Sequence, residues 1–254
     1  MPRALLLIAD IGGYTRFMKV HRINLAHAQY VVGQLLEAVI DAAPRAYTVA
    51  KLEGDAAFFY ATLPEVGQGD SGKFGGAVAA IRRAFLRRRA ELVIDRACTC
   101  DGCVQASELK LKFVGHVGEI AFQKVKRFRE VAGVDVIHVH RLLKNSVPLS
   151  EYVLMSEPLK DSVEEALRAQ VTALDEHLEG LGDARSFYVD LASTVEAPVT
   201  RASSALRRLF AWLKMTLRSL PFMVGVRTPC DGFRNMRGIL VAGTSADPAP
   251  KELA

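Results

Sequence analysis

The segment LLLIADIGGYTRFM, residues 5–18, joins an apolar run to a carboxylate and a pair of glycines. Residues 3–9 have the composition of a buried strand, and Asp10 stands where that strand is expected to end. The sequence allows two interpretations of Asp10, Gly12 and Gly13. They form an ordinary turn, or they form a site where a metal ion and an anion meet the end of a sheet. The second is favoured by chemistry, because carboxylates bind hard cations and glycine lets the backbone approach a ligand closely.

A second carboxylate occupies a comparable place in AYTVAKLEGDAAFFYATL, residues 46–63. The pattern indicates two strands joined by a tight turn at Glu53-Gly54-Asp55. Turns at one edge of a sheet would bring Asp55 and Asp10 together. Two such carboxylates suit Mg²⁺ when the ion also binds phosphates, and two ions about 4 Å apart stabilise an in-line phosphoryl displacement.

The rest of the pattern alternates helices with strands. The expected helices span 24–42, 76–96, 134–144 and 157–179, and the expected strands span 108–125 (a pair that turns at Gly118), 151–156 and 184–192. This order predicts an α+β sandwich in which helices pack on a mainly antiparallel sheet. The arginine runs at 82–83 and 87–89 are interpreted as a solvated helix face.

The composition is typical of a folded cytoplasmic protein. The 254 residues are 50% hydrophobic and 24% charged, and no apolar run approaches the ~18 residues of a membrane span. No signal-peptide cleavage site follows the N-terminal apolar run, and the four cysteines are expected to be reduced. The net charge of +5 is concentrated between 201 and 237, and no nucleic-acid-binding motif accompanies it, so we expect no nucleic-acid partner.

The chain divides at the linker-like stretch STVEAPVTRASS, residues 193–204, into a domain over 1–197 and an extension over 198–254. Within the extension, residues 205–220 have the spacing of a basic amphipathic helix that ends before a tail. Such a helix can lie on an anionic membrane surface, cover an apolar edge of the sheet or dock on a partner. We favour internal docking, and a membrane-peripheral location remains the alternative.

Four motifs resemble those of the class III nucleotidyl cyclases, in the family's order between about residues 3 and 157. ADIGGYTRF (9–17) and KLEGDAAFFY (51–60) resemble the two metal motifs of that family. LKFVGHVGEIAF (111–122) resembles its strand and glycine turn, and EVAGVDVIHVHRLLKNS (130–146) resembles its Gly-x-x-Val-Asn-x-Ala-x-Arg-Leu segment. The sequence of the last segment most resembles an uncharacterised branch of this cyclase superfamily, which is described as a domain of unknown function. The resemblance implies a ferredoxin-like, cyclase-type sandwich.

The resemblance also implies roles for individual residues. Asp10 and Asp55 would hold two Mg²⁺ or Mn²⁺ ions, with help from the backbone carbonyl of Ile11. The triphosphate of a purine nucleoside triphosphate would meet the backbone around Gly12, Gly13 and Thr15.

Three further residues would come from a partner subunit, as the resemblance implies. Lys51 and Glu130 would select the purine base, with ATP the favoured substrate, and Arg141 would stabilise charge on the transferring phosphate. A working site therefore implies a head-to-tail homodimer. Ile137 stands where the family has an Asn that orients the ribose, and an isoleucine side chain can neither donate nor accept a hydrogen bond. Two functions remain open: an adenylate cyclase, which is a lyase, or a catalytically inactive signalling module that responds to metal, redox state or a membrane.

The stretch CTCDGC places Cys98, Cys100 and Cys103 within an insertion over 97–106 that the cyclase pattern lacks. Three thiols this close suit Zn²⁺, with a fourth ligand from His116, Cys230 or elsewhere. A redox-sensing dithiol and a loop without a ligand are the alternatives. Two further histidines, His138 and His140, could be metal ligands if their stretch were a strand. On the expected helix they diverge, and we favour a structural role for both.

Overall fold

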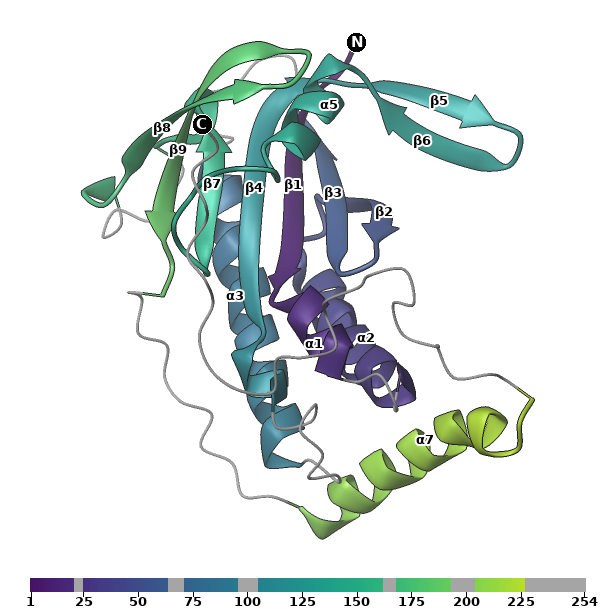
Figure 1. Cartoon of the computed structure of the whole chain (residues 1–254). Coiled ribbons are helices and arrows are strands. Elements are labelled where there is room, and N and C mark those ends of the chain that lie inside the picture. Colours follow the sequence, from purple (N-terminus) through teal and green to yellow (C-terminus); the bar gives the residue numbers. More distant parts are fainter. Residues whose placement is uncertain (21–24, 64–70, 96–104, 162–167, 193–203, 227–254) are drawn as a thin grey trace, which may run out of the picture.

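The computed structural model describes residues 1–20, 25–63, 71–95, 105–161, 168–192 and 204–226 (Figure 1). A seven-stranded sheet has the order β2-β3-β1-β4-β7-β9-β8, and all its pairs are antiparallel except β4–β7. Its strands are β1 (Arg3–Gly12), β2 (Thr48–Glu53), β3 (Ala56–Thr62), β4 (Lys110–Glu119), β7 (Tyr152–Ser156), β8 (Thr172–Leu178) and β9 (Gly182–Asp190). The expectation of an α+β fold with a mainly antiparallel sheet is confirmed.

Helices lie on both faces of this sheet. The helices are α1 (Tyr14–Val20), α2 (Leu25–Ala42), α3 (Ser71–Ile94), α5 (Val134–Arg141) and α7 (Ala205–Met223), and the short 3₁₀ turns are η1 (Ala106–Glu108) and η2 (Glu157–Leu159). The long helices α2 and α3 cover one face, and α5 packs on the other face against β4 and β1 (Figure 1).

Strand β1 is the centre of both hydrophobic cores. Leu5, Leu7 and Ala9 pack with the residues of α2 and α3, whereas Leu6 and Ile8 pack with the residues of α5. All five side chains are fully buried. A strand that is buried on both faces needs a continuous apolar run, and this is why LLLIA precedes Asp10.

Two strands lie within 108–125 as expected, but the turn expected at Gly118 is wrong. Strand β4 continues straight through Gly118, which pairs with Ala4 of β1, and the chain leaves the sheet at the fully buried Ile120. The glycine serves a close contact instead of a turn, because a Cβ at position 118 would lie 2.1 Å from Cγ of Asp135 on α5.

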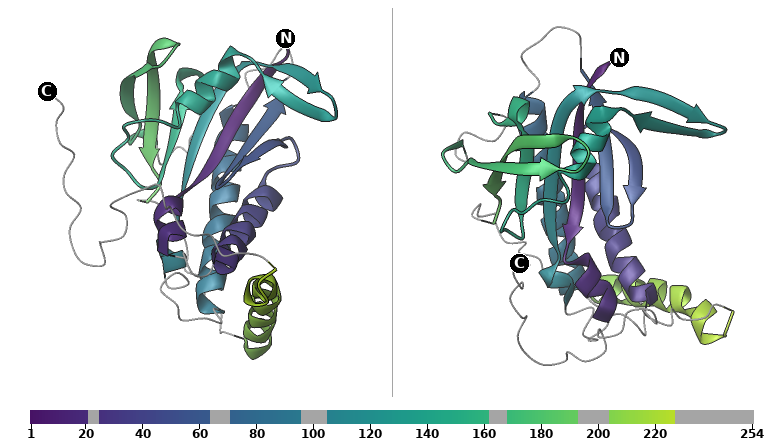
Figure 2. Two further views of the ribbon diagram at one scale, coloured as in Figure 1. Left: turned by 45° about the vertical axis from the view of Figure 1, so that its right-hand side comes forward. Right: turned by 45° about the horizontal axis from the view of Figure 1, so that its top comes forward.

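The next segment forms an arm. Strands β5 (Ala121–Val125) and β6 (Phe128–Ala132) pair only with each other and project from the body at the end opposite α7 (Figures 1 and 2). The sequence pattern did not predict β6.

The single helix expected over 157–179 is also wrong, because residues 172–178 form a strand. The chain forms η2 and then β8, which pairs with β9 at the edge of the sheet. Most side chains of β8 face solvent, and only Leu178 is buried, so the charged composition reflects an exposed edge strand. Residues 162–167 lie outside the described part of the chain.

The solvated-face interpretation of the α3 arginines holds for Arg83 and Arg87 but fails for Arg82. Arg82 is 6% exposed, donates to the Leu191 carbonyl at 2.8 Å and lies 3.5 Å from the buried carboxylate of Glu151. A buried arginine of this kind joins α3 to the end of β9 and the start of β7.

Helix α7 contacts α2 at the base of the molecule (Figure 2). Its Arg207 lies 3.7 Å from the Asp95 carboxylate. Its apolar side chains nevertheless remain 42–68% exposed: Leu206, Leu209, Phe210, Trp212, Leu213, Leu217 and Leu220. The expected internal docking is therefore limited to contacts with α2 and with Asp95 at the end of α3, and it leaves these apolar side chains exposed. No helix in the described ranges is long and apolar enough to cross a membrane. The boundary expected at 197/198 and the tail after 226 lie outside these ranges.

We predict that Gly115→Ala lowers the free energy of unfolding by about 1–3 kcal/mol. A Cβ at this buried position of β4 would lie 2.3 Å from the ring of Phe74 on α3, which is itself fully buried. Urea unfolding measures the loss. Gly76→Ala on α3 is the matched control, because its Cβ would meet nothing within 4 Å, and we expect it to stabilise by about 0.5–1 kcal/mol. Equal effects of the two substitutions would contradict the packing described.

Candidate metal and nucleotide site

Asp10 and Asp55 lie side by side at one end of the sheet. Asp10 pairs with Ala56 across β1 and β3, and the Ile11 amide donates to the Asp55 carbonyl at 3.1 Å. The hairpin turn thus places the second carboxylate next to the end of the first strand. Asp10 points to the α5 face of the sheet, since it alternates with Ile11 and Ala9, which face the other core.

A lysine that the sequence did not single out completes this pair. Lys112 of β4 is the cross-strand partner of Asp10, and its Nζ lies 2.8 Å from Asp10 Oδ2. Burial lowers the pKa of Lys112, but the hydrogen bond to Asp10 and the charges of Asp10 and Asp55 more than offset it, so that the pKa is raised overall. Lys112 is therefore a fixed positive charge beside the carboxylates.

One lysine does not neutralise both acids. Burial, followed by the charge of Asp10, raises the pKa of Asp55 to about 6, while Lys112 opposes the rise. Burial and the charge of Asp55 also raise the pKa of Tyr14. Crowded carboxylates of this kind favour a cation, and two carboxylates with a nearby backbone carbonyl are a donor set that fits Mg²⁺ or Mn²⁺.

The glycines form the turn from β1 into α1. Gly12 ends the strand, and Gly13 has a φ of +85°, a conformation that strains other residues. The Phe17 amide donates to the Gly13 carbonyl at 2.9 Å and so closes the first turn of α1, which contains the exposed Thr15. The turn brings Gly12, Gly13 and Thr15 to the same end of the sheet as Asp10.

Lys51 and Glu130 line one pocket of about 250 Å³ between β2, β6 and α5. Lys51 Nζ lies 3.4 Å from Glu53, and His140 of α5 lies 3.5 Å from the same carboxylate. The imidazole of His140 also packs edge-on against Phe58 at 5.0 Å, and burial lowers its pKa. Lys51 and Glu130, the two residues for which the resemblance implies base selection, thus line the same pocket.

Arg141 does not line this pocket. Its guanidinium donates instead to Glu179 in the turn between β8 and β9. Ile137 on the same helix is 51% exposed. Within one chain the candidate residues therefore form separate groups: the carboxylates with the glycine turn, the Lys51 pocket, and Arg141.

Cys98, Cys100, Cys103 and Cys230 lie outside the described residues. The zinc and redox hypotheses for the cysteine-rich insertion therefore stay predictions.

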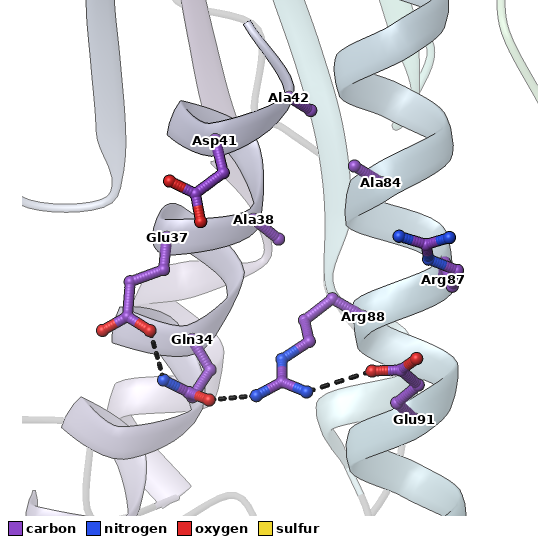
Figure 3. A pocket seen from close by; sticks show the side chains of 9 residues that line it. All are labelled: Gln34, Glu37, Ala38, Asp41, Ala42, Ala84, Arg87, Arg88 and Glu91. Atoms are coloured by element: carbon purple, nitrogen blue, oxygen red, sulfur yellow. Dashed lines mark hydrogen bonds and ion pairs between the residues drawn. The ribbon is translucent and has the colours of Figure 1, made fainter.

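A second hollow of about 340 Å³ lies between α2 and α3, on the opposite face of the sheet (Figure 3). Arg88 of α3 donates both to Gln34 of α2 and to Glu91, and Gln34 donates to Glu37. These polar groups satisfy one another and tie the two helices together. We therefore interpret this hollow as part of the helix packing.

The sequence is similar to one family model and to a mycobacterial protein. The family model "Protein of unknown function (DUF2652)" matches residues 32–152. The "Uncharacterized protein Rv2561/Rv2562" of Mycobacterium tuberculosis is 41% identical over 218 residues, which are 86% of this chain and 99% of that protein.

Several solved structures share the fold. The adenylyl cyclase CyaB from P. aeruginosa has a TM-score of 0.57 and 13% identity, over 78% of this chain and 97% of that one. A Trypanosoma brucei adenylate cyclase in its monomeric state has a TM-score of 0.53 and 15% identity, over 80% and 96%. The guanylyl cyclase Cya2 has a TM-score of 0.50 and 13% identity, over 80% and 100%. The cyclase-type fold expected from the motifs is confirmed.

We predict that Asp55→Asn stabilises the chain near pH 7.5 and that this gain disappears as the pH falls to about 4. The folded-state pKa of about 6 lies above the ordinary value of 3.8, so the folded chain binds more protons than the unfolded chain in that window. The free energy of unfolding of the wild type consequently falls as the pH rises from about 4 to above 6. Urea unfolding across this pH range measures the difference.

Asp175→Asn is the control for this series, since Asp175 lies on the exposed edge strand β8. A gain for Asp55→Asn that does not change with pH, or one that Asp175→Asn reproduces, would contradict the crowding of the two carboxylates.

Proposed function

The chain belongs to the family of the mycobacterial protein Rv2561/Rv2562, and on that premise we propose that it is a divergent cyclase-like signalling protein. It binds a purine nucleoside triphosphate together with a divalent metal. The observation that carries this proposal is the adjacency of Asp10 and Asp55 at the sheet end, where burial and, after it, the charge of Asp10 raise the pKa of Asp55 to about 6.

Asp10, Asp55 and the Ile11 carbonyl would hold Mg²⁺ or Mn²⁺. Ions bound there would offset the negative charge that develops on the reacting phosphate. Lys112 competes with such an ion for Asp10, because its Nζ already lies 2.8 Å from that carboxylate. Metal binding therefore requires Lys112 to share Asp10 or to move aside.

The nucleotide would lie between the glycine turn of one subunit and the Lys51 pocket of the other. Backbone groups around Gly12, Gly13 and Thr15 would contact the triphosphate. In the pocket, Lys51 is a donor and Glu130 is an acceptor, and adenine offers the complementary ring nitrogen and exocyclic amine. ATP is therefore the proposed nucleotide.

The proposed reaction is cyclisation of ATP in a head-to-tail homodimer. The ribose 3′-hydroxyl loses its proton to solvent, its oxygen attacks the α-phosphorus to form a new P–O bond, and pyrophosphate leaves with the electrons of the broken P–O bond. Arg141 would stabilise charge on the transferring phosphate after its release from Glu179. Within one chain Arg141 is held by Glu179 and does not line the Lys51 pocket, which supports a site to which two subunits contribute.

We expect Mn²⁺-dependent ATP binding, and we expect Asp10→Ala and Asp55→Ala each to weaken it at least tenfold, because each removes a metal ligand. Isothermal titration with ATP and with GTP, alongside an assay for cyclic product, measures both parts. Asp41→Ala is the matched control, since Asp41 lies in the hollow between α2 and α3 (Figure 3). Binding that survives both site substitutions, or that Asp41→Ala weakens equally, would contradict the site.

The same assay tests the catalytic part with Ile137→Asn. An amide at this exposed position of α5 supplies the hydrogen bonds that isoleucine lacks, so we expect the rate of cyclic-product formation to rise. Val134→Asn is the control, because Val134 is 66% exposed on the same helix. If ATP binds and no variant forms product, the enzymatic proposal fails and a non-catalytic nucleotide sensor remains.

A second candidate function, a catalytically inactive module that docks on a membrane, is favoured by α7. Seven of its apolar side chains are exposed, and Arg207, Arg208 and Lys214 lie among them. Basic amphipathic helices of this composition bind anionic lipid surfaces.

We therefore expect the chain to co-sediment with vesicles that contain phosphatidylserine, and more weakly with vesicles of phosphatidylcholine alone. The double substitution Leu209→Glu with Leu213→Glu should abolish sedimentation, because it places charge on the apolar face. Leu181→Glu, at the exposed turn between β8 and β9, is the control and should sediment as the wild type does. Equal sedimentation of all three proteins would exclude α7 as the membrane contact.

A further inference from the structure

Three potential metal ligands gather between β4 and α5, away from the Asp10–Asp55 pair. They are His116 of β4 with Asp135 and His138 of α5, and their ligand atoms all lie within 4.8 Å of one another. His116 Nε2 is 3.0 Å from Asp135 Oδ1, and the two imidazole rings are 4.4 Å apart between centroids.

The backbone is arranged to bring these groups together. Asp135 and His138 are three residues apart on α5, a spacing that places both side chains on one face of the helix. Gly118 leaves room for the Asp135 carboxylate against β4, where any Cβ would collide with it. Gly133, with a φ of +139°, allows the abrupt entry into α5 just before Asp135.

Each ligand is oriented by a second contact or by burial. The Glu119 amide donates to Asp135 Oδ2 at 2.6 Å, which leaves Oδ1 directed at His116. His116 is 7% exposed, and its Nδ1 lies 2.8 Å from the Ser156 hydroxyl. The Nε2 atom of His116 therefore faces the cluster, in the way that a hydrogen bond to one ring nitrogen orients the other toward a metal.

We propose that His116, Asp135 and His138 form a binding site for one divalent transition-metal ion of the Zn²⁺ type. Two imidazoles and one carboxylate are the donor set of three-ligand zinc sites, which leave a further position for water or a ligand. The same donors disfavour Mg²⁺, which prefers oxygen ligands. His140, two residues further along α5, faces Glu53 and does not belong to the set.

This site is distinct from the proposed nucleotide site and does not rest on it. His116 is four residues from Lys112 along β4, a separation of about 13 Å in an extended strand. Both sites lie on the α5 face of the sheet. A metal bound to β4 and α5 would clamp the helix that carries Ile137 and Arg141 to the sheet, and would thereby fix the position of both residues.

Titration with Co²⁺ tests the proposal, because Co²⁺ is a visible-absorbing substitute for Zn²⁺. The full chain first receives Asp10→Ala, Asp55→Ala and Cys→Ser at all four cysteines, so that these other ligands cannot contribute. We expect one Co²⁺ per chain, with absorption bands of nitrogen and oxygen coordination that disappear when Zn²⁺ is added. His138→Ala should weaken the affinity for Co²⁺ at least ~100-fold. Residues that only support a metal ligand typically change metal affinity by ~10-fold to 100-fold, so a larger loss indicates a direct ligand.

His140→Ala is the matched control and should leave the Co²⁺ affinity unchanged. His138→Ala keeps the His116–Asp135 contact, so its fold should persist, and circular dichroism checks this. If the fold is altered, His138→Asp, which restores an oxygen ligand, should bind Co²⁺ more tightly than His138→Ala. The absence of stoichiometric Co²⁺ binding, or an equal loss in His138→Ala and His140→Ala, would overturn the proposal. Loss of ATP binding in the earlier experiment would not affect it.

Discussion

The placement of β1 is the constraint on which the rest of the structure depends. The strand is paired along both edges, with β3 and β4, and buried on both faces, so it cannot slide without breaking two ladders and two cores. A slip by one residue would exchange its two faces and carry the Asp10 side chain to the side of α2 and α3. The double burial of β1 therefore sets the position of the carboxylate relative to Asp55 and Lys112.

The sequence predicted what depends on local pattern. The apolar run of β1, the hairpin at Asp55 and the helical spacing of α2 are all readable in short windows. Lys112 and Arg82 were missed, because their partners Asp10 and Glu151 are distant in the sequence and meet only once the strand order is known. The charged strand β8 was mistaken for a helix, since an edge strand that faces solvent loses the alternation that identifies strands.

The candidate site illustrates the same division. The motifs predicted which residue types gather at the end of β1, but the charge balance there depends on Lys112, which only the register reveals. The sequence did not predict the cluster of His116, Asp135 and His138, for a related reason. Its members come from a strand and a helix, and the sequence indicated correctly that His138 and His140 diverge on that helix without indicating which one meets the strand.

The close approach of α5 to β4 has a consequence for how the two elements evolve. The backbone conformation of β4 at Gly118 is one that any residue can adopt. Glycine is needed there because the Asp135 side chain fills the space that a Cβ would take. Substitution at either position therefore changes which residues the other one tolerates. Because the Cβ of Asp135 would itself lie 2.4 Å from a Cβ at 118, a side chain at 118 requires glycine at 135 or a shift of α5 away from β4, so the two positions should vary as a pair and not independently.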